Sequence, residues 1–114
     1  MVSKWEIYFC SLDPTEGSEQ RGTRPVLIIS TDSVNHNLTV STVLPLSSVK
    51  PNDKIYPTEV LLPMEVSGLP KLSVAMVQQI RTVSHSRLIN KVSTITDEET
   101  RFKISEACRD YFDL

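Results

Sequence analysis

Residues 13–30 read Asp-Pro-Thr-Glu-Gly-Ser-Glu-Gln-Arg-Gly-Thr-Arg-Pro-Val-Leu-Ile-Ile-Ser, a polar loop that runs directly into an apolar segment. Gly17 and Gly22 lie within the loop, where glycine permits positive φ or a close approach of the backbone to a ligand. Pro25 fixes φ at the start of the apolar segment 25–31 and holds Arg24 in an extended conformation. A short apolar run bounded by turn residues predicts a strand buried on both faces.

Further strands are predicted on both sides of this stretch. Residues 5–12 carry aromatic and β-branched side chains and end at the turn signal Asp13-Pro14. Beyond turn residues at 32–37, strand-like composition returns at 38–46, at 56–62 and, past a Gly/Pro loop at 63–71, at 72–80. Short strands separated by frequent turn residues predict a small, strongly bent sheet or barrel.

The hydrophobic period changes near the C-terminus. Thr96 and Glu99 form a capping box, which predicts that a helix begins there. The apolar residues that would share one face of this helix are Ile104, Ala107, Cys108 and Tyr111. Residues 84–90 predict a shorter helix. We therefore expect one α+β domain, mainly β, over residues 1–114, with the C-terminal helix packed on the sheet.

Charge is unevenly distributed along the chain. The formal net charge is −2 over 114 residues. Residues 97–114 hold six acids and three bases, which gives −3 and leaves +1 for residues 1–96. The bases in or beside predicted loops are Arg21, Arg24, Lys50, Lys54, Arg81 and Arg87. A locally basic face suited to phosphate is therefore compatible with the acidic total.

Composition also bears on the compartment. No apolar run approaches the roughly 20 residues of a membrane helix, and the N-terminus carries no apolar signal segment. Cys10 and Cys108 lack metal or redox spacing, so two buried thiols are favoured over a disulfide. A cytoplasmic protein is expected.

The loop 13–24 holds the candidate chemistry. Arg24 lies where a mobile loop meets a rigid strand, and its guanidinium can donate two parallel hydrogen bonds to a phosphate. Glu19 is the carboxylate between the two glycines. From these residues alone, an ordinary glycine-rich surface loop with a solvated arginine is the favoured interpretation.

The motifs in this chain resemble those of the MazF/PemK family of bacterial toxins. Residues 13–25 fit the family pattern D-P-x-x-G-x-E-Q-x-G-x-R-P, which an apolar strand follows. The resemblance continues in order through 44–48 (Leu-Pro-Leu-Ser-Ser), 56–57 (Tyr-Pro), 79–83 (Gln-Ile-Arg-Thr-Val), 86–88 (Ser-Arg-Leu) and the final acidic helix. It therefore extends over nearly the whole chain.

The resemblance implies a metal-independent endoribonuclease without a cofactor, built as a small SH3-like (CcdB/MazF-type) barrel and working as a homodimer. Such toxins cut single-stranded RNA, chiefly mRNA, at short sequences and are inhibited by a cognate MazE-like antitoxin. Attack by the 2′-OH would leave a 2′,3′-cyclic phosphate and a 5′-OH, and DNA would resist cleavage.

The resemblance also assigns roles. Arg24 matches the catalytic arginine and would stabilise the dianionic phosphorane. Ser47 occupies the position of a catalytic threonine, and Pro45, which cannot donate to a sheet ladder, marks an edge or bulge just before it. Ser48 is an alternative source of the hydroxyl. Two roles remain open for Glu19. It acts on the 2′-OH, which it positions or deprotonates, or it only anchors the loop through backbone N–H groups.

Residues in the surrounding loops are expected to bind RNA. This set comprises Gln20, Arg21, Ser48, Lys50, Lys54, Tyr56, Gln78, Gln79 and Arg81. Tyr56 either stacks on a base or, as we favour slightly, packs within its strand. Position 78 is Gln where many relatives carry Asp or Glu, so any role of that carboxylate is lost here.

Other chemistries are less well supported. His36 in a turn and His85 near a helix start are better explained as solvated or capping residues than as a catalytic pair. Asp, His and Cys are not clustered as metal ligands. Two alternatives remain: a CcdB-like toxin that poisons DNA gyrase without catalysis, and a family member that has lost activity.

Overall fold

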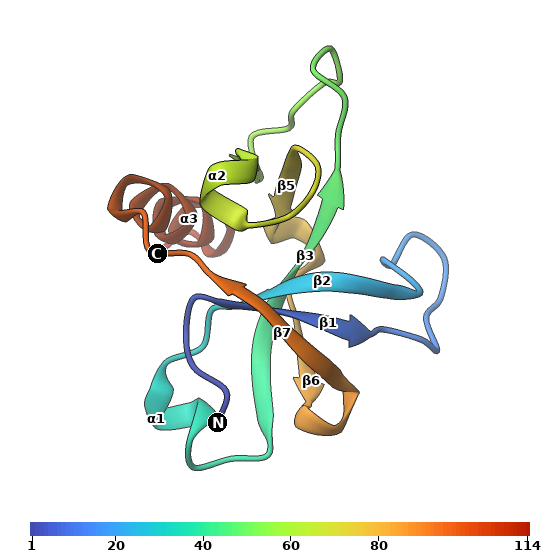
Figure 1. Cartoon of the computed structure of the whole chain (residues 1–114), viewed down its shortest axis with the longest axis vertical. Coiled ribbons are helices and arrows are strands. Elements are labelled where there is room, and N and C mark those ends of the chain that lie inside the picture. Colours follow the sequence, from blue (N-terminus) through green and yellow to red (C-terminus); the bar gives the residue numbers. More distant parts are fainter.

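The computed structural model describes residues 1–114. Its strands are β1 (Glu6–Ser11), β2 (Thr23–Ile28), β3 (Val40–Ser48), β4 (Glu59–Leu62), β5 (Ser73–Met76), β6 (Arg81–Ser84) and β7 (Leu88–Thr94). Its α-helices are α1 (Asp32–Asn35), α2 (Met64–Ser67) and α3 (Glu98–Phe112), and its 3₁₀ turns are η1 (Val77–Gln79) and η2 (His85–Arg87). Figure 1 shows the bent sheet with α3 against one side and the β1–β2 loop on the other. No helix is long and apolar enough to cross a membrane.

All strand pairs are antiparallel. The strand order is β4-β5-β3-β2-β1-β7, and β6 pairs with β3 outside this path. No ladder joins the outer strands β4 and β7, so the sheet is barrel-like without being closed. The expected bent sheet with a C-terminal helix is confirmed. The strands predicted at 5–12, 56–62 and 72–80 are shorter in the structure, whereas β2 begins two residues before its predicted start and β3 ends two residues beyond its predicted end.

Strand β3 is shared by three ladders. It pairs with β2 at Val43–Pro45, with β6 at Val40–Val43 and with β5 at Leu46–Ser48. Pro45 therefore lies where the second partner of β3 changes from β6 to β5. A residue without an N–H donor fits a position between two ladders. The prediction that Pro45 marks a sheet edge was wrong, because β3 is an interior strand.

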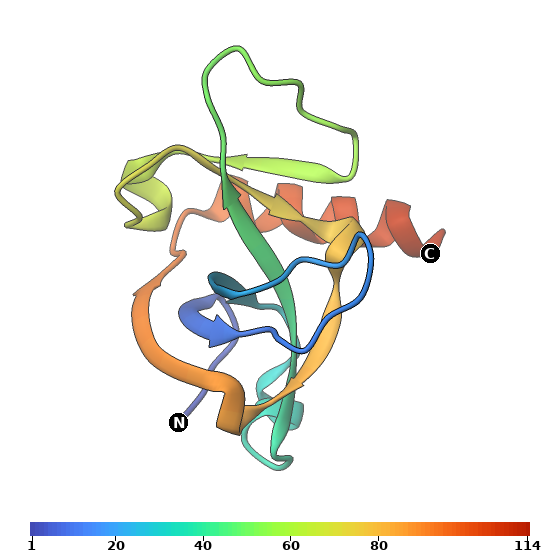
Figure 2. The ribbon, with the colours of Figure 1, turned by 90° about the vertical axis from the view of Figure 1, so that its right-hand side faces the viewer.

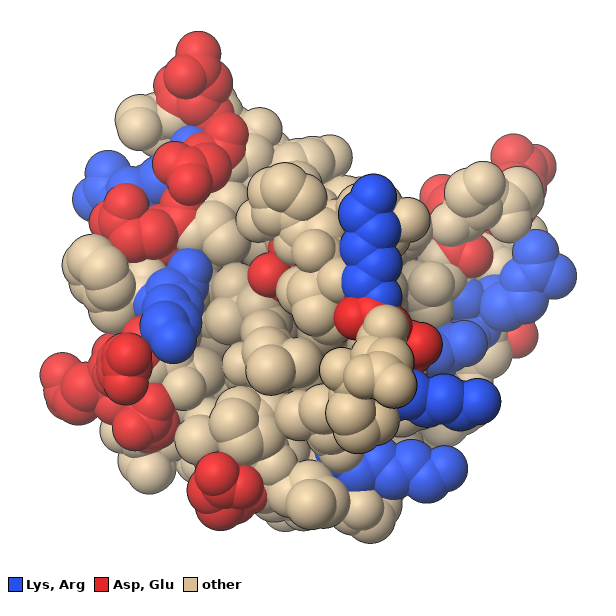
Figure 3. Space-filling model, turned by 90° about the horizontal axis from the view of Figure 1, so that it is seen from above, with Lys and Arg blue, Asp and Glu red and all other residues tan.

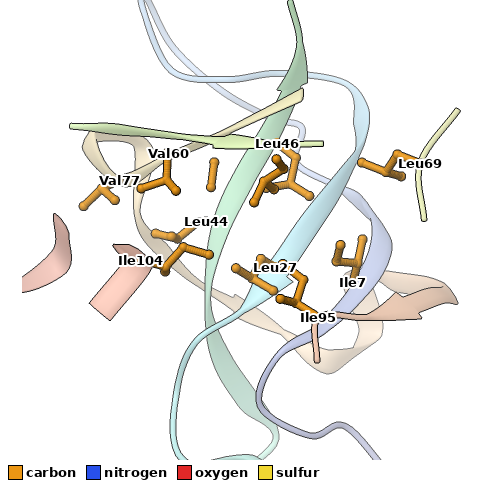
Figure 4. Close-up of a cluster of buried hydrophobic side chains, with 11 residues drawn as sticks. Ile7, Leu27, Leu44, Leu46, Val60, Leu69, Val77, Ile95 and Ile104 are labelled. Atoms are coloured by element: carbon orange, nitrogen blue, oxygen red, sulfur yellow. The ribbon is translucent and has the colours of Figure 1, made fainter. Parts of the chain in front are cut away.

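Strand β2 separates two clusters of buried side chains. Leu27 belongs to the larger cluster, which also contains Ile7, Leu44 and Ile104 from α3 (Figure 4). Val26 and Ile28 belong to the second cluster with Cys10 and Val83. Because successive strand residues point to opposite faces, this division confirms a strand buried on both faces.

The C-terminal helix departs from its prediction at both ends. Asp97, rather than Thr96, is the N-cap, and its carboxylate accepts hydrogen bonds from the Thr100 amide at 2.9 Å and the Thr100 hydroxyl at 2.6 Å. Ile104 is buried, and Ala107 and Cys108 pack against the core. Tyr111 is 43% exposed because it lies beyond the sheet, where nothing covers the expected apolar face.

Three more segments correct the sequence analysis. The helix expected at 84–90 is only the turn η2, because the residues after it pair with β1 as strand β7. The loop 63–71 contains α2, which ends at Gly68 with φ 72°. The turn at 32–37 contains α1. Cys10 and Cys108 are free thiols, as expected, but only Cys10 is buried and Cys108 is half-buried; partial burial raises the pKa of each.

Candidate active site

The β1–β2 loop has its own internal order. The Glu19 carboxylate accepts a hydrogen bond from the Glu16 amide at 2.6 Å, and the Glu19 amide donates to the Glu16 carbonyl at 3.1 Å. Gly17 and Gly22 adopt φ of 53° and 81°, a region that disfavours other residues. Glu19 thus makes the anchoring contact that was one of its two predicted roles.

Arg81 of β6 and Arg87 of η2 hold the stem of this loop. Arg81 donates to the Leu12 carbonyl at 3.1 Å. Arg87 donates to the Ser11 carbonyl at 3.1 Å and to the Asp13 carbonyl at 2.6 Å. Because carbonyls carry no net charge, these contacts fix the arginines without neutralising them. Arg81, predicted to bind RNA, therefore has a structural contact, whereas Arg87 was not assigned a role.

Arg24 is half-buried in β2, where the loop meets the sheet. Its Nε donates to the Arg21 carbonyl at 2.9 Å, which fixes one edge of the guanidinium. Arg21 in turn donates to the Gly17 carbonyl at 3.1 Å. Neither arginine forms an ion pair, so their positive charges remain available to an anion.

A groove of about 490 Å³ runs beside Arg24. Its cationic and hydroxyl side chains are Arg21, Arg24, Lys71, Thr23, Ser48 and Ser73. Phe9, Pro25, Leu46 and Leu69 form its apolar lining, and no acidic residue borders it. The sequence analysis missed Phe9, Lys71 and Ser73, because no motif contains them and Lys71 lies in a Gly/Pro loop.

The two candidate hydroxyls lie on different faces of β3. The β2–β3 ladder ends at the Val26–Pro45 pair, so neither hydroxyl is paired with Arg24 across it. Ser48 shares the face of Leu46 and borders the groove. Ser47 is half-buried and Ser48 is exposed. Ser48 therefore shares the groove with Arg24, whereas Ser47 does not border it.

A second, smaller cavity of about 190 Å³ lies between the loop and η1. It is lined by Glu19, Gln20, Pro45, Gln78, Gln79, Ile80 and Arg81. The Gln79 side chain receives the Gln20 amide at 3.1 Å and donates to the Ser18 carbonyl at 3.0 Å. The Gln20 side-chain oxygen is buried without a hydrogen-bond partner, an uncommon state that suits an incoming donor.

The β3–β4 loop lies apart from both cavities. Lys50, Lys54 and Tyr56 are exposed and border neither of them. Tyr56 precedes β4 and is 52% exposed, so the slight preference for a packed strand residue was wrong. Lys54 Nζ lies 5.0 Å from the centre of the Tyr56 ring. Figure 2 shows this loop at the top of the molecule, above the β1–β2 loop.

The histidines are engaged outside these cavities. His85 Nε2 lies 2.8 Å from the buried Ser41 hydroxyl, and His36 Nε2 lies 3.1 Å from the Ser3 hydroxyl. They belong to hydrogen-bonded clusters around α1 and η2. The structure contains no group of three or more His, Cys, Asp and Glu side chains suited to a metal ion.

Surface charge separates the groove from α3. Figure 3 shows acidic side chains concentrated toward α3, with Lys and Arg prominent on the opposite side, where the β1–β2 loop lies. On α3, Lys103 lies 3.5 Å from Glu99 and Arg109 lies 3.9 Å from Glu106. A groove bordered by two arginines and a lysine and by no acid is suited to a negatively charged ligand.

Comparison with known proteins specifies the family. Residues 3–110 match the family model described as the PemK-like, MazF-like toxin of type II toxin–antitoxin systems. The chain therefore belongs to this family. It is 35% identical over 107 residues to Endoribonuclease EndoA of Bacillus subtilis (strain 168), a match that covers 94% of this chain and 90% of that protein.

Solved structures share the fold over almost the whole chain. The Mycobacterium tuberculosis toxin MazF-mt6 superposes with a TM-score of 0.77 at 27% identity, covering 96% of this chain and 97% of the toxin. MazF from Deinococcus radiodurans gives a TM-score of 0.82 at 20% identity, covering 99% and 97% of the two chains. The second likeness concerns the fold alone.

Proposed function

We propose that this chain is the toxin of a type II toxin–antitoxin system and acts as a metal-independent endoribonuclease on single-stranded RNA, chiefly mRNA. The observation that carries this proposal is Arg24, held by its Nε and free of any ion pair beside an acid-free groove. Family membership and the 35% identity to a protein named as an endoribonuclease support the reaction class. We propose that residues 1–114 form one toxin domain.

The proposed reaction is an internal transesterification. The 2′-hydroxyl loses its proton and attacks the neighbouring phosphorus, while the bond to the 5′-oxygen breaks and that oxygen leaves protonated. The products are a 2′,3′-cyclic phosphate and a 5′-OH. Arg24 stabilises the charge that develops on the phosphorane, the role for which a fixed guanidinium is suited.

Ser47 and Glu19 support this step in different ways. Ser47, which follows the last residue of β3 paired with β2 by two positions, donates a hydrogen bond to the phosphate. The Glu19 carboxylate is engaged with the Glu16 amide, so its role is to order the loop that carries Arg21 and leads into Arg24. Arg81 and Arg87 hold the stem of this loop.

The groove receives the RNA on either side of the cut. Arg21 and Lys71 contact phosphates from opposite walls, and Ser48 and Ser73 contribute hydroxyl donors. Phe9 and the other apolar lining residues suit the face of an unstacked base. Gln20 and Gln79 border the second cavity, while Lys50, Lys54 and Tyr56 extend contacts along the β3–β4 loop.

The family description implies a cognate antitoxin, and we propose a MazE-like partner for this chain. An acidic peptide that covers the cationic groove would compete with RNA. We also propose that the toxin works as a homodimer in the cytoplasm, where its mRNA substrate occurs.

Incubation of purified protein with a mixed RNA in EDTA, followed by mapping of the cleaved ends, tests this proposal. Cuts at a short recurring sequence, with cyclic phosphate and 5′-OH ends, are expected, and the matching DNA should remain intact. The CcdB-like alternative predicts no RNA cleavage and trapping of DNA gyrase instead. That result would overturn the endoribonuclease proposal.

A further inference from the structure

The turn η1 lies between the two loops that flank the proposed RNA site. It contains three residues, and a 3₁₀ turn has about three residues per turn, so their side chains point in three directions. Val77 points into the core and is fully buried. Gln78 and Gln79 are therefore fixed on a rigid base and directed to opposite sides.

Gln79 is directed toward the β1–β2 loop. Its side chain accepts from the Gln20 amide and donates to the Ser18 carbonyl, at 3.1 and 3.0 Å. Both bonds involve backbone groups, so they fix the path of the loop irrespective of its side chains. One glutamine thus joins η1 to a loop about 60 residues away in sequence.

Gln78 is directed toward the end of the β3–β4 loop. Its side-chain oxygen accepts from the Thr58 hydroxyl at 2.9 Å, and its side-chain nitrogen donates to the Glu59 carboxylate at 2.9 Å. The other carboxylate oxygen of Glu59 accepts from the Tyr56 amide at 3.0 Å. The chain of bonds therefore runs from η1 through Glu59 to the backbone of Tyr56.

We propose that Gln78 is a positioning residue, which holds the β3–β4 loop through Glu59 as Gln79 holds the β1–β2 loop. The amide is required because Glu59 needs a donor: a carboxylate at position 78 would face another carboxylate at hydrogen-bond distance. Gln78 thus sets the relative position of the two loops without itself contacting the RNA. This consequence for RNA binding rests on the proposed function.

Exchanging the amide of Gln78 with the carboxylate of Glu59 tests this proposal. Gln78→Glu places two carboxylates together and should release Glu59 from Tyr56. The double variant Gln78→Glu/Glu59→Gln restores every bond, because the new amide donates to the new carboxylate and its oxygen still accepts from the Tyr56 amide. Hydrogen exchange of the Tyr56 amide, measured without RNA, should accelerate about tenfold in the single variant and return to the wild-type rate in the double variant.

RNA cleavage by the same variants reports the functional consequence. Gln78→Glu should raise KM about tenfold with little change in kcat, as expected when a loop that binds substrate is misplaced. The double variant should recover the wild-type KM and cutting sites. Arg109→Gln on α3 is a control that alters a charge outside the cavity lined by Glu59, and it should leave KM unchanged.

A double variant as impaired in KM as Gln78→Glu would overturn the proposal, because it would mean that the residue at position 78 itself contacts RNA. An unchanged exchange rate in Gln78→Glu would overturn it as well. If the wild-type protein cut no RNA, the proposed function would fail, but the exchange measurement would still decide whether Gln78 positions the loop.

Discussion

The β1–β2 region and helix α3 use the same charged residue types in opposite ways. In and around the loop, arginines donate to backbone carbonyls: Arg24 to Arg21, Arg81 to Leu12 and Arg87 to Ser11. On α3, Lys103 and Arg109 instead lie beside acids one turn away, while Arg101 donates to the Ile95 carbonyl at 2.8 Å. The loop region therefore fixes cations without cancelling them, whereas on the helix two of the three cations lie beside acids in an excess of negative charge.

This difference separates a functional surface from a structural one. A guanidinium bound to a neutral carbonyl keeps its charge for a phosphate and loses little freedom when the phosphate binds. Exposed pairs on a helix contribute only a few tenths of a kcal/mol each to stability. The net charge of the chain therefore says little about what its groove attracts, and each region can be altered separately.

The largest expected effect follows from replacement of Arg24. Arg24→Lys keeps the charge but loses the planar fork and the Nε contact to the Arg21 carbonyl. We expect kcat/KM for RNA cleavage to fall about 10²- to 10³-fold, the usual cost of one transition-state donor. Arg109→Lys is the matched control on α3 and should leave kcat/KM unchanged. Near wild-type turnover by Arg24→Lys would show that charge alone is sufficient.

A core substitution in α3 should affect stability rather than chemistry. Ile104 is 1% exposed and packs with Leu27 and Leu44. Ile104→Ala should lower the free energy of unfolding by about 2–5 kcal/mol, measured by urea denaturation. Arg21→Ala in the exposed loop should change it by no more than about 0.5 kcal/mol. Equal losses of unfolding free energy in the two variants would contradict the distinction between a structural helix and a functional loop.

Local patterns predicted much of the fold and some of the proposed site. The apolar run in β2 and the helical period in α3 appear in neighbouring residues, so both elements were found. Strand β7 was missed because its pairing with β1 joins residues more than 75 positions apart, and no local period reveals such a ladder. The place of Lys71 at the groove and the contact of Glu59 with Gln78 were missed for the same reason, because only tertiary folding brings these residues together.

The next largest effect on RNA cleavage is expected from substitution of the two serines at the end of β3. Ser48 borders the groove with Arg24, whereas Ser47 is the residue that matches the family's catalytic threonine. Ser47→Ala should reduce kcat by about 10-fold, because one hydrogen bond to a charged phosphate is lost. Ser48→Ala should mainly raise KM, by a few-fold. Single-turnover cleavage separates the two effects, and the reverse ranking would place Ser48 at the scissile phosphate.

Lys71 and Lys103 allow the comparison of free and paired cations to be tested directly. Lys71 borders the groove without an ion pair, whereas Lys103 is paired with Glu99. Lys71→Gln should weaken RNA binding a few-fold and reduce the slope of log affinity against log salt by about 0.7, the share of one phosphate contact on a single strand. Lys103→Gln should leave the slope unchanged. Equal slopes in both variants would exclude Lys71 from the RNA path.

The smallest expected effect is on stability and comes from the N-terminus of α3, where the charge of Asp97 stabilises the fold and has no part in RNA binding. Hydrogen bonds from the Thr100 hydroxyl and then the Thr100 amide lower the pKa of Asp97. Since the folded pKa lies below the unfolded value of about 4, the cap stabilises the protein above that pH and is lost as the pH falls through the folded pKa. The unfolded state binds more protons in this window, so the melting temperature should decline with acidification.

Melting temperatures between pH 2 and pH 7 would reveal the cap, because Asp97→Asn should lower Tm at neutral pH and show a smaller difference from wild type in acid. Thr100→Val, which retains the backbone donor, should give an intermediate pH profile. RNA cleavage by folded Asp97→Asn at pH 7 should match wild type, since the groove and α3 carry separate charges. A loss of cleavage without a loss of Tm would mean that the acidic helix contributes to RNA binding after all.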